Sequence, residues 1–316
     1  MKIVFCGTPQ FAVPTFEALH AAGHEIALAV SQPDRPVGRK QLLTAPPVKE
    51  AALAMGIPVT QPETIRKNAE FRAQLEAIAP DAIIVVAYGR IIPPWMLALP
   101  RFGCINLHAS LLPRYRGAAP IQWAVANGDP VTGNSTMLLE EGLDTGPILL
   151  QQTVPIAPEQ TAAGLFESLA QDGAPLVLKT LAGLADGSIQ PTPQDHAQAT
   201  LAPILTREDG CMDFARPAIE LKHRWRGFQP WPGAYTKLEG KKFIVHRLDV
   251  ADAASCALPA SAKPGEIFIA DHRLFAACGQ GSWLELLEIQ LEGKKRVSTA
   301  DFLRGTHLAS GVQFGS

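Results

Sequence analysis

The feature that most constrains the fold is DAIIVVAYG, an unbroken apolar run at residues 81–89. A strand with one solvated face alternates polar and apolar side chains, whereas a strand covered on both faces reads as a continuous run of this kind. Similar runs occur at residues 2–6 and 26–30, and helix-like segments follow at residues 48–55 and 65–78. Strands that alternate with helices pair in parallel through right-handed crossovers. The N-terminal half therefore predicts a Rossmann-like α/β fold with a mostly parallel sheet.

The next predicted strand, residues 103–108, carries a polar pair. Asn106 and His108 are two positions apart, so the period of a strand sends both side chains to one face. Hydrogen bonding within a buried loop network is one explanation for such a pair. The other is acyl transfer, because an amide and an imidazole can assist while a carbonyl oxygen becomes negative and an amine loses a proton.

Asp144 is the third polar candidate, and it lies between Gly142 and Gly146 in the segment GLDTG. The glycines allow the backbone to turn tightly around it. A lone Asp in such a turn usually caps the turn with its own carboxylate. The presence of Asn106 and His108 in the same stretch of sequence favours a catalytic carboxylate instead.

These residues belong to a longer pattern. The run SLLPRYRGAAPIQ at residues 110–122, preceded by NLHA and followed by GLDTG, resembles the folate-dependent formyltransferases, and the resemblance extends over nearly the whole chain. That family uses an Asn, a His and an Asp in this order, which implies catalytic roles for Asn106, His108 and Asp144. The implied reaction is direct attack of an amine on a formyl carbon. Asn106 and His108 form the oxyanion site, and Asp144 orients His108 or accepts the proton.

The resemblance also implies a cofactor. The formyl donor is expected to be 10-formyltetrahydrofolate, and no metal is expected. The segment that matches the border of the folate site is implied to be cofactor-binding, with a cis bond between Leu112 and Pro113. Because ligands of parallel sheets gather beyond the carboxyl ends of the strands, Tyr88 and Gly89 are candidates too, although a core position for Tyr88 fits the sequence equally well. The cofactor-binding candidates are Ser110, Leu111, Leu112, Pro113, Tyr88 and Gly89.

The C-terminal part has a different character. We expect a catalytic domain at residues 1–189, a Pro- and Gly-rich linker at 190–204 and a second domain at 205–316. Several short β-like runs with turn signals between them predict a small OB-like β-barrel in the second domain. The aromatic residues Trp231 and Trp283 are more typical of a barrel core than of base-stacking platforms.

Three features indicate the members of the family that formylate the methionine of initiator methionyl-tRNA at translation initiation. They are the loop PDRPVGR, the motif GLDTG and a C-terminal domain that begins with the motif PWPGAYT. The implied tRNA contacts are Arg35, Arg39, Lys40, Lys241 and Lys242. A loop with several cations is otherwise a solvated surface.

Two rival functions stay open. The same N-terminal residues would serve a formyltransferase that acts on another amine, such as glycinamide ribonucleotide or an amino-sugar nucleotide. A non-catalytic folate-binding or RNA-binding protein is a different class, and it predicts the loss of at least one of the three polar residues.

Composition sets the remaining limits. With 316 residues, 47% of them hydrophobic and 18% charged, the chain is long enough for two domains with sizeable cores. Five scattered cysteines predict reduced thiols, and the chain has no apolar run of the roughly 18 residues that a membrane helix needs. We therefore expect a cytoplasmic monomer without a membrane segment. The net charge of −2 permits a locally basic face for RNA without predicting one. Asn134 is a departure, because an apolar residue is expected there.

Overall fold

The computed structural model describes residues 1–38, 41–254, 256–259 and 261–315. The chain divides into two compact units. The first unit comprises Met1–Ile121, Val131–Ile156 and Gly164–Pro203. The second comprises Gln122–Pro130, Ala157–Ala163 and the residues from Ile204 onward.

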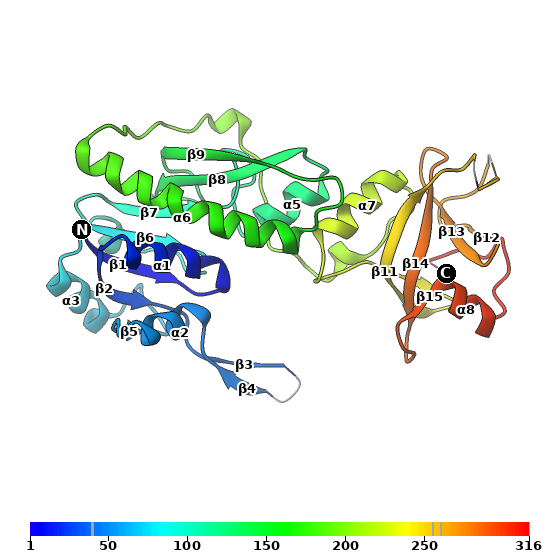
Figure 1. Ribbon diagram of the computed structural model, residues 1–316, viewed down its shortest axis with the longest axis horizontal. Coiled ribbons are helices and arrows are strands. Elements are labelled where there is room, and N and C mark those ends of the chain that lie inside the picture. The colour runs from blue at the N-terminus through cyan, green and yellow to red at the C-terminus, as the bar shows by residue number, and fades with distance from the viewer. Residues whose placement is uncertain (39–40, 255, 260, 316) are drawn as a thin grey trace. The chain divides into compact units, whose positions relative to one another are not determined.

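The described part of the first unit contains a seven-stranded sheet in the order β5-β2-β1-β6-β7-β8-β9 (Figure 1). Its strands are β1 (Lys2–Gly7), β2 (Glu25–Val30), β5 (Val59–Thr60), β6 (Ala82–Val86), β7 (Cys104–His108), β8 (Val131–Leu138) and β9 (Ile148–Pro155). Every pairing from β5 to β7 is parallel, and β8 and β9 are antiparallel to their neighbours. The predicted Rossmann-like, mostly parallel sheet is confirmed.

Helices cover both faces of this sheet. They are α1 (Val13–Ala21), α2 (Pro47–Ala54), α3 (Ala69–Ile78), α4 (Pro94–Leu97) and α6 (Ala162–Asp186), with the short 3-10 helices η1 (Gln10–Ala12) and η2 (His196–Gln198). On one face, Phe5 of β1 packs edge-on against Phe16 of α1, with 5.0 Å between the ring centroids. On the other face, Val4 and Cys6 join a core cluster with Phe71 of α3.

The same alternation fixes the faces of β7. Gly173 of α6 lies so close to Leu107 that a Cβ atom built on it would be 2.5 Å from Leu107 Cδ2. Cys104, in contrast, belongs to the core cluster that contains Phe71 of α3. Asn106 and His108 share the face of Cys104, because alternate residues of a strand point the same way. The site strand is therefore backed by α6, and its two polar residues point away from that helix.

Two local features differ from the sequence prediction. Residues that read as a loop form a hairpin of β3 (Arg35–Val37) and β4 (Leu42–Thr44). The stretch predicted as a linker, residues 190–204, belongs up to Pro203 to the first unit. There Thr192 exchanges two backbone hydrogen bonds of 2.8 Å with Ile148, and Ala202 is fully buried. Prolines prevent regular structure in this stretch, but they do not prevent it from packing.

Asn134 lies on β8 and is fully buried. Its Nδ2 donates a hydrogen bond of 2.9 Å to the carbonyl of Leu169 in α6. Its Oδ1 has no partner among the described residues. An amide thus occupies the expected apolar position with one of its two polar atoms satisfied.

The second unit is built on an antiparallel sheet in the order β10-β11-β14-β13-β12, with β15 paired to β14 in the described residues. Its strands are β10 (Tyr235–Leu238), β11 (Lys241–Ala251), β12 (Ile267–Ala270), β13 (Arg273–Ala277), β14 (Trp283–Leu291) and β15 (Val297–Ser298). The helices are α7 (Ala218–Gly227), α8 (Thr299–Gly305) and η3 (Glu208–Gly210), and α5 (Pro120–Ala126) begins in the first unit and ends in the second.

The two tryptophans of the second unit that were expected in its core differ. Trp283 is buried, as predicted, in a cluster with Phe275. Trp231 is 55% exposed, so the prediction of a core position is wrong for this residue. It stands between Pro230 and Pro232, in a turn that projects its ring outward. Within the described residues, no helix is both long enough and apolar enough to cross a membrane.

Candidate active site

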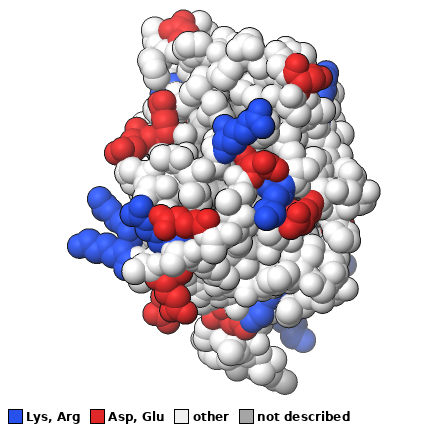
Figure 2. Space-filling model, turned by 90° about the vertical axis from the view of Figure 1, so that its left-hand side faces the viewer, with Lys and Arg blue, Asp and Glu red and all other residues white. Residues whose placement is uncertain are grey.

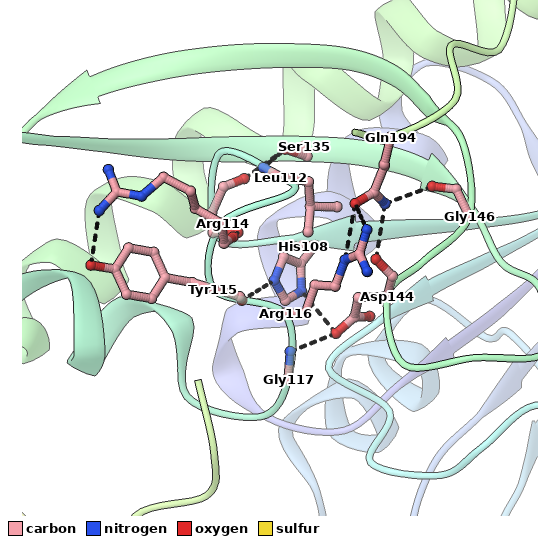
Figure 3. A network of polar contacts seen from close by, with 11 residues as sticks. His108, Leu112, Arg114, Tyr115, Arg116, Gly117, Ser135, Asp144, Gly146 and Gln194 are labelled. Atoms are coloured by element: carbon pink, nitrogen blue, oxygen red, sulfur yellow. Dashed lines mark hydrogen bonds and ion pairs between the residues drawn. The ribbon is translucent and has the colours of Figure 1, made fainter. Parts of the chain in front are cut away.

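The candidate catalytic residues come from two places along the chain. Asn106 and His108 lie at the carboxyl end of β7, which is the end where ligands of parallel sheets bind. Asp144 lies in the connection between β8 and β9. Because β8 runs antiparallel to β7, with Leu138 opposite Ile105 and Ser135 opposite His108, this connection starts beside the amino end of β7. The connection itself, and not the strand order, carries the carboxylate of Asp144 to the imidazole of His108 (Figure 3).

His108 is buried, and both of its ring nitrogens face defined groups. Nε2 is 2.8 Å from the carbonyl oxygen of Tyr115. A carbonyl only accepts hydrogen bonds, so Nε2 carries a proton. Nδ1 is 3.8 Å from Asp144 Oδ2, which is close enough for charge attraction but too long for a hydrogen bond. Nδ1 is therefore the ring nitrogen that is available to a reacting molecule.

Asp144 is held by its backbone and by its side chain. Its φ of 52° is in the left-handed region, which costs a non-glycine residue about 1 kcal/mol. Its Oδ2 accepts a hydrogen bond of 2.8 Å from the backbone N–H of Gly117. Gly117 has a φ of 119°, and a Cβ atom built there would lie 2.7 Å from the carbonyl oxygen of Ala202. A glycine is required at this position to present its N–H to Asp144.

Asn106 is half-buried on β7, opposite Val85 of β6 and Met137 of β8. Among the described residues, no group forms a hydrogen bond with its side chain, which distinguishes it from the buried amide of Asn134. The polar pair predicted from the sequence thus separates into an anchored imidazole and an amide that is free to meet a ligand.

The loop after β7 is fixed by Ser135 of β8. Ser135 Oγ donates a hydrogen bond of 2.6 Å to the carbonyl of Ser110 and accepts one of 3.1 Å from the N–H of Leu112. Gln151 Nε2 donates to the same hydroxyl and to the carbonyl of Leu112. The peptide bond between Leu112 and Pro113 is cis, as expected. This network gives the loop one conformation in spite of its irregular backbone.

The candidate cofactor-binding residues of the loop after β7 differ in how deeply they are buried. Ser110 and Leu112 are buried, and Ser110 Oγ donates a hydrogen bond to the carbonyl of Arg114. Leu111 and Pro113 are half-buried. The first pair shapes the loop from within, whereas the second pair reaches its surface.

Tyr88 lies in the core, which is the alternative that the sequence left open. Its ring belongs to the cluster that contains Phe71, and burial raises the pKa of its hydroxyl. Its backbone carbonyl accepts hydrogen bonds from Thr8 Oγ1 and Gln32 Nε2 at the carboxyl edge of the sheet. Gly89 follows it there, exposed and with a φ of 79°. A ligand at this edge meets the backbone of these two residues and not the ring of Tyr88.

Two residues of the site were missed by sequence reasoning. Gln194, which is 6% exposed, contacts both the turn of Asp144 and the side chain of Arg116. Arg116, whose guanidinium faces the amide of Gln194 in Figure 3, is itself buried. These contacts join residues 50 and 78 positions apart, and no local pattern of the sequence signals them.

The candidate tRNA contacts are exposed where they are described. Arg35 lies on β3, and Lys241 and Lys242 begin β11. Lys242 Nζ is 4.2 Å from the centroid of the Tyr235 ring. Arg39 and Lys40 lie outside the described residues. On the face drawn in Figure 2, Lys and Arg are interspersed with Asp and Glu, so that face is not uniformly basic.

Among the described residues, no group of three or more His, Cys, Asp and Glu side chains could hold a metal ion. A shallow surface depression is lined by residues from α4 and from the end of β8 onward, and none of the candidate residues belongs to its lining. The lining residues are Pro94, Leu97, Ala98, Leu139, Glu140 and Glu141.

Comparison with known proteins gives the family. The model of the family described as formyl transferase matches residues 1–181, and that of the formyl transferase C-terminal domain matches residues 204–307. The methionyl-tRNA formyltransferase of Acidobacterium capsulatum is 63% identical over 316 residues and covers 100% of both chains. That of Koribacter versatilis is 56% identical over 315 residues, covering 100% of this chain and 99% of the relative.

Solved structures share the fold at low identity. The sugar 3N-formyl transferase WlaRD, solved in the presence of dTDP and 5-N-formyl-THF, has a TM-score of 0.64 at 15% identity, covering 93% of this chain and 99% of that chain. HypX from Aquifex aeolicus in complex with tetrahydrofolic acid has a TM-score of 0.61 at 17% identity, and the match covers 96% of this chain but 47% of HypX. The match of the first family model to more than half of the chain, together with the full-length relatives, shows that the chain belongs to the formyltransferase family.

Proposed function

We propose that this protein transfers the formyl group of 10-formyltetrahydrofolate to the amino group of methionine on initiator methionyl-tRNA. The observation that carries the proposal is the approach of the Asp144 carboxylate to His108, on a strand whose Asn106 shares the face of His108, in a chain of this family. The full-length relatives named for methionyl-tRNA support the choice of acceptor.

The surroundings of the site fit a reduced pterin. Asn106 offers an amide without a protein partner among the described residues, and the backbone at Gly89 is exposed. Polar groups of this kind suit the edge of a planar heterocycle. When bound, the folate supplies an activated formyl carbon.

The protein residues act on the charges that develop in the transfer. The amide of Asn106 donates to the formyl oxygen as that oxygen becomes negative. The Nδ1–H of protonated His108 donates to the same oxygen, while the Tyr115 carbonyl anchors Nε2. The removal of one such donor costs about 10²- to 10³-fold in rate.

Asp144 acts on two groups in this step, the imidazolium of His108 and the attacking amine. Its carboxylate, 3.8 Å from Nδ1, stabilises the imidazolium. Because Oδ2 is engaged by Gly117, the second carboxylate oxygen is the one that accepts the proton of the attacking amine, directly or through water. This proton can then pass to the folate nitrogen, which leaves as its bond to the formyl carbon breaks. A correctly placed proton acceptor contributes roughly 10²- to 10⁴-fold.

The acceptor is assigned to both parts of the chain. We place catalysis in residues 1–189, completed by the packed stretch up to Pro203, and tRNA binding in residues 205–316 and in the hairpin around Arg35. The exposed Lys241 and Lys242 are suited to the phosphates of RNA.

The test supplies labelled 10-formyltetrahydrofolate with charged initiator tRNA, glycinamide ribonucleotide and an amino-sugar nucleotide in parallel. Label on the methionyl-tRNA is expected. Label on one of the other amines would favour the alternative acceptors, and label on none would refute the proposal.

The site assignment is tested by single-turnover rates of Asn106→Ala, His108→Ala and Asp144→Ala. Each should fall at least about 10²-fold while folate binding survives. His20→Ala, which changes an exposed histidine on α1, is the matched control and should keep the wild-type rate. A wild-type rate in one of the three site variants would remove that residue from the mechanism.

A further inference from the structure

We propose that Gln194 is a positioning residue for the transfer. It holds the turn that carries Asp144 against the loop that carries Gly117. The inference rests on the proposed function, because it assigns to Asp144 the role described there.

The side-chain amide of Gln194 makes four contacts with two separate segments (Figure 3). Its Nε2 donates hydrogen bonds to the backbone carbonyls of Asp144, at 2.9 Å, and Gly146, at 2.7 Å. Its Oε1 accepts hydrogen bonds from Arg116 Nε, at 3.1 Å, and from Arg116 Nη2, at 2.7 Å. The amide therefore joins the turn after β8 to the loop after β7.

The backbone of residues 192–202 makes the same connection on a larger scale. Thr192 pairs with Ile148, immediately after the turn of Asp144. Thr200 and Ala202 exchange backbone hydrogen bonds with Arg116, at 2.8 and 2.7 Å. We call residues 192–202 the strap. Gln194 is the part of the strap whose side chain reaches both segments at once.

The chemistry of the position requires an amide. Two carbonyls need donors, and a guanidinium needs an acceptor, and a primary amide has both. A glutamate would keep the acceptor for Arg116, but it would lose the donors and place a second negative charge beside Asp144. A methionine would keep the length of the side chain and lose all four contacts.

The consequence for catalysis is geometric. Asp144 holds a left-handed backbone conformation, and its carboxylate meets His108 and the Gly117 N–H from that turn. Without the amide, the carbonyls of Asp144 and Gly146 lose their buried donor, and the turn is free to move away from the loop. A displacement of about 1 Å in an acid–base group lowers turnover by about 10²-fold.

The first experiment measures Gln194→Met and Gln194→Glu in the full-length protein. Both should lower kcat about 10²-fold with less than about a threefold change in KM for either substrate, because the lost contacts touch no substrate. Amide hydrogen exchange of Gly117 should accelerate in both variants. Gln198→Met, which changes an exposed glutamine of the same strap, is the matched control and should behave as the wild type. If Gln194→Met does not fold, Gln194→Glu decides, since it retains the Arg116 contact.

The second experiment introduces Gln194→Met into Asp144→Ala. A residue that acts through Asp144 has nothing further to lose there, so the residual single-turnover rate should fall by less than about twofold. An equal loss in both backgrounds, or a wild-type kcat for folded Gln194→Met, would overturn the inference. Absence of transfer to methionyl-tRNA by the wild-type protein would refute the proposed function instead. In that case, an unchanged rate of amide hydrogen exchange at Gly117 in the Gln194 variants would still overturn the positioning role of Gln194. An accelerated rate would support that role.

Discussion

The two units use polar side chains in opposite ways. Around the candidate site of the first unit, the polar contacts are buried and mostly join an uncharged group to a backbone group, as with Ser135 and Gln194. On the sheet of the second unit, several of them are ion pairs between charged side chains, as with Arg273 and Glu285 or Arg296 and Glu288.

The difference in burial indicates which contacts fix the arrangement of the side chains around them. A buried donor or acceptor that loses its partner costs about 1–3 kcal/mol, so a buried network has one favoured arrangement. An exposed ion pair is worth about 0–1 kcal/mol and is screened by salt. We therefore expect changes around the site to lower the rate, and changes of surface pairs in the second unit to alter stability slightly and in a salt-dependent way.

The largest effect that sharpens this comparison is expected from Gly117→Ala. The new Cβ would meet the Ala202 carbonyl at 2.7 Å, at a φ of 119° that L residues rarely adopt. The strap must then shift, and the hydrogen bond from Gly117 to Asp144 is lost. Turnover should fall about 10²-fold.

The control for this variant is Gly56→Ala. Gly56 also has a positive φ, of 67°, but no atom lies within 4 Å of a Cβ built there. This change should cost about 1 kcal/mol of unfolding free energy and leave kcat unchanged. Equal turnover numbers for the two variants would show that the close contact at Gly117 does not control the site.

The sequence predicted the elements of this site better than its connections. The continuous apolar runs indicated the parallel sheet, and the spacing of Asn106 and His108 placed them correctly on one face, because both signals are local. Gln194 was assigned to a linker because prolines and polar residues around it are typical of one. Its role depends on partners 50 and 78 positions away, and no local pattern carries that information.

Tyr88 and Trp231 show the same limit. The sequence placed Tyr88 at the correct edge of the sheet, but the rotation of its ring into the core depends on the packing of α3. Trp231 is exposed because its turn projects it from the second unit. For both aromatic residues, the residue type indicates that the side chain favours a core. The tertiary packing around it decides whether it is buried there.

A smaller effect is expected where a buried polar group of the first unit lies away from the site. Asn134 faces α6, and its Oδ1 has no partner among the described residues. Asn134→Leu removes one hydrogen bond together with this unsatisfied acceptor, and the Leu169 carbonyl keeps its hydrogen bond within α6. Because no buried polar atom is left without a partner, the exchange is close to neutral or stabilising. The free energy of unfolding in urea should rise by up to about 1 kcal/mol, with kcat unchanged. A fall in kcat would contradict the assignment of Asn134 to the face of β8 that packs on α6, opposite the face on which Ser135 holds the loop of the site.

The smallest effect is expected in the second unit. Lys222 Nζ is 2.8 Å from Asp249 Oδ1 and 2.6 Å from Glu159 Oε1. The hydrogen bond from Lys222 holds the pKa of Asp249 below its ordinary value. A carboxyl whose pKa is lowered by folding stabilises the folded state above its unfolded-state pKa, and this contribution is lost as the pH falls through the folded-state pKa.

Asp249→Asn should therefore lower the unfolding free energy at pH 7 by about 0.5 kcal/mol, since the carboxyl is largely exposed. The difference from the wild type should shrink below about pH 4, where aspartates protonate, and in about 1 M salt, which screens the pair. Tryptophan fluorescence can follow this unfolding, because four of the five tryptophans belong to the second unit. Asp271→Asn, at an exposed turn, is the control for the loss of one negative charge from this unit. If the Asp249 variant lost as much stability at pH 3 as at pH 7, the amide would be disturbing the packing around Lys222, and the contrast between geometry in one unit and charge in the other would fail at this pair.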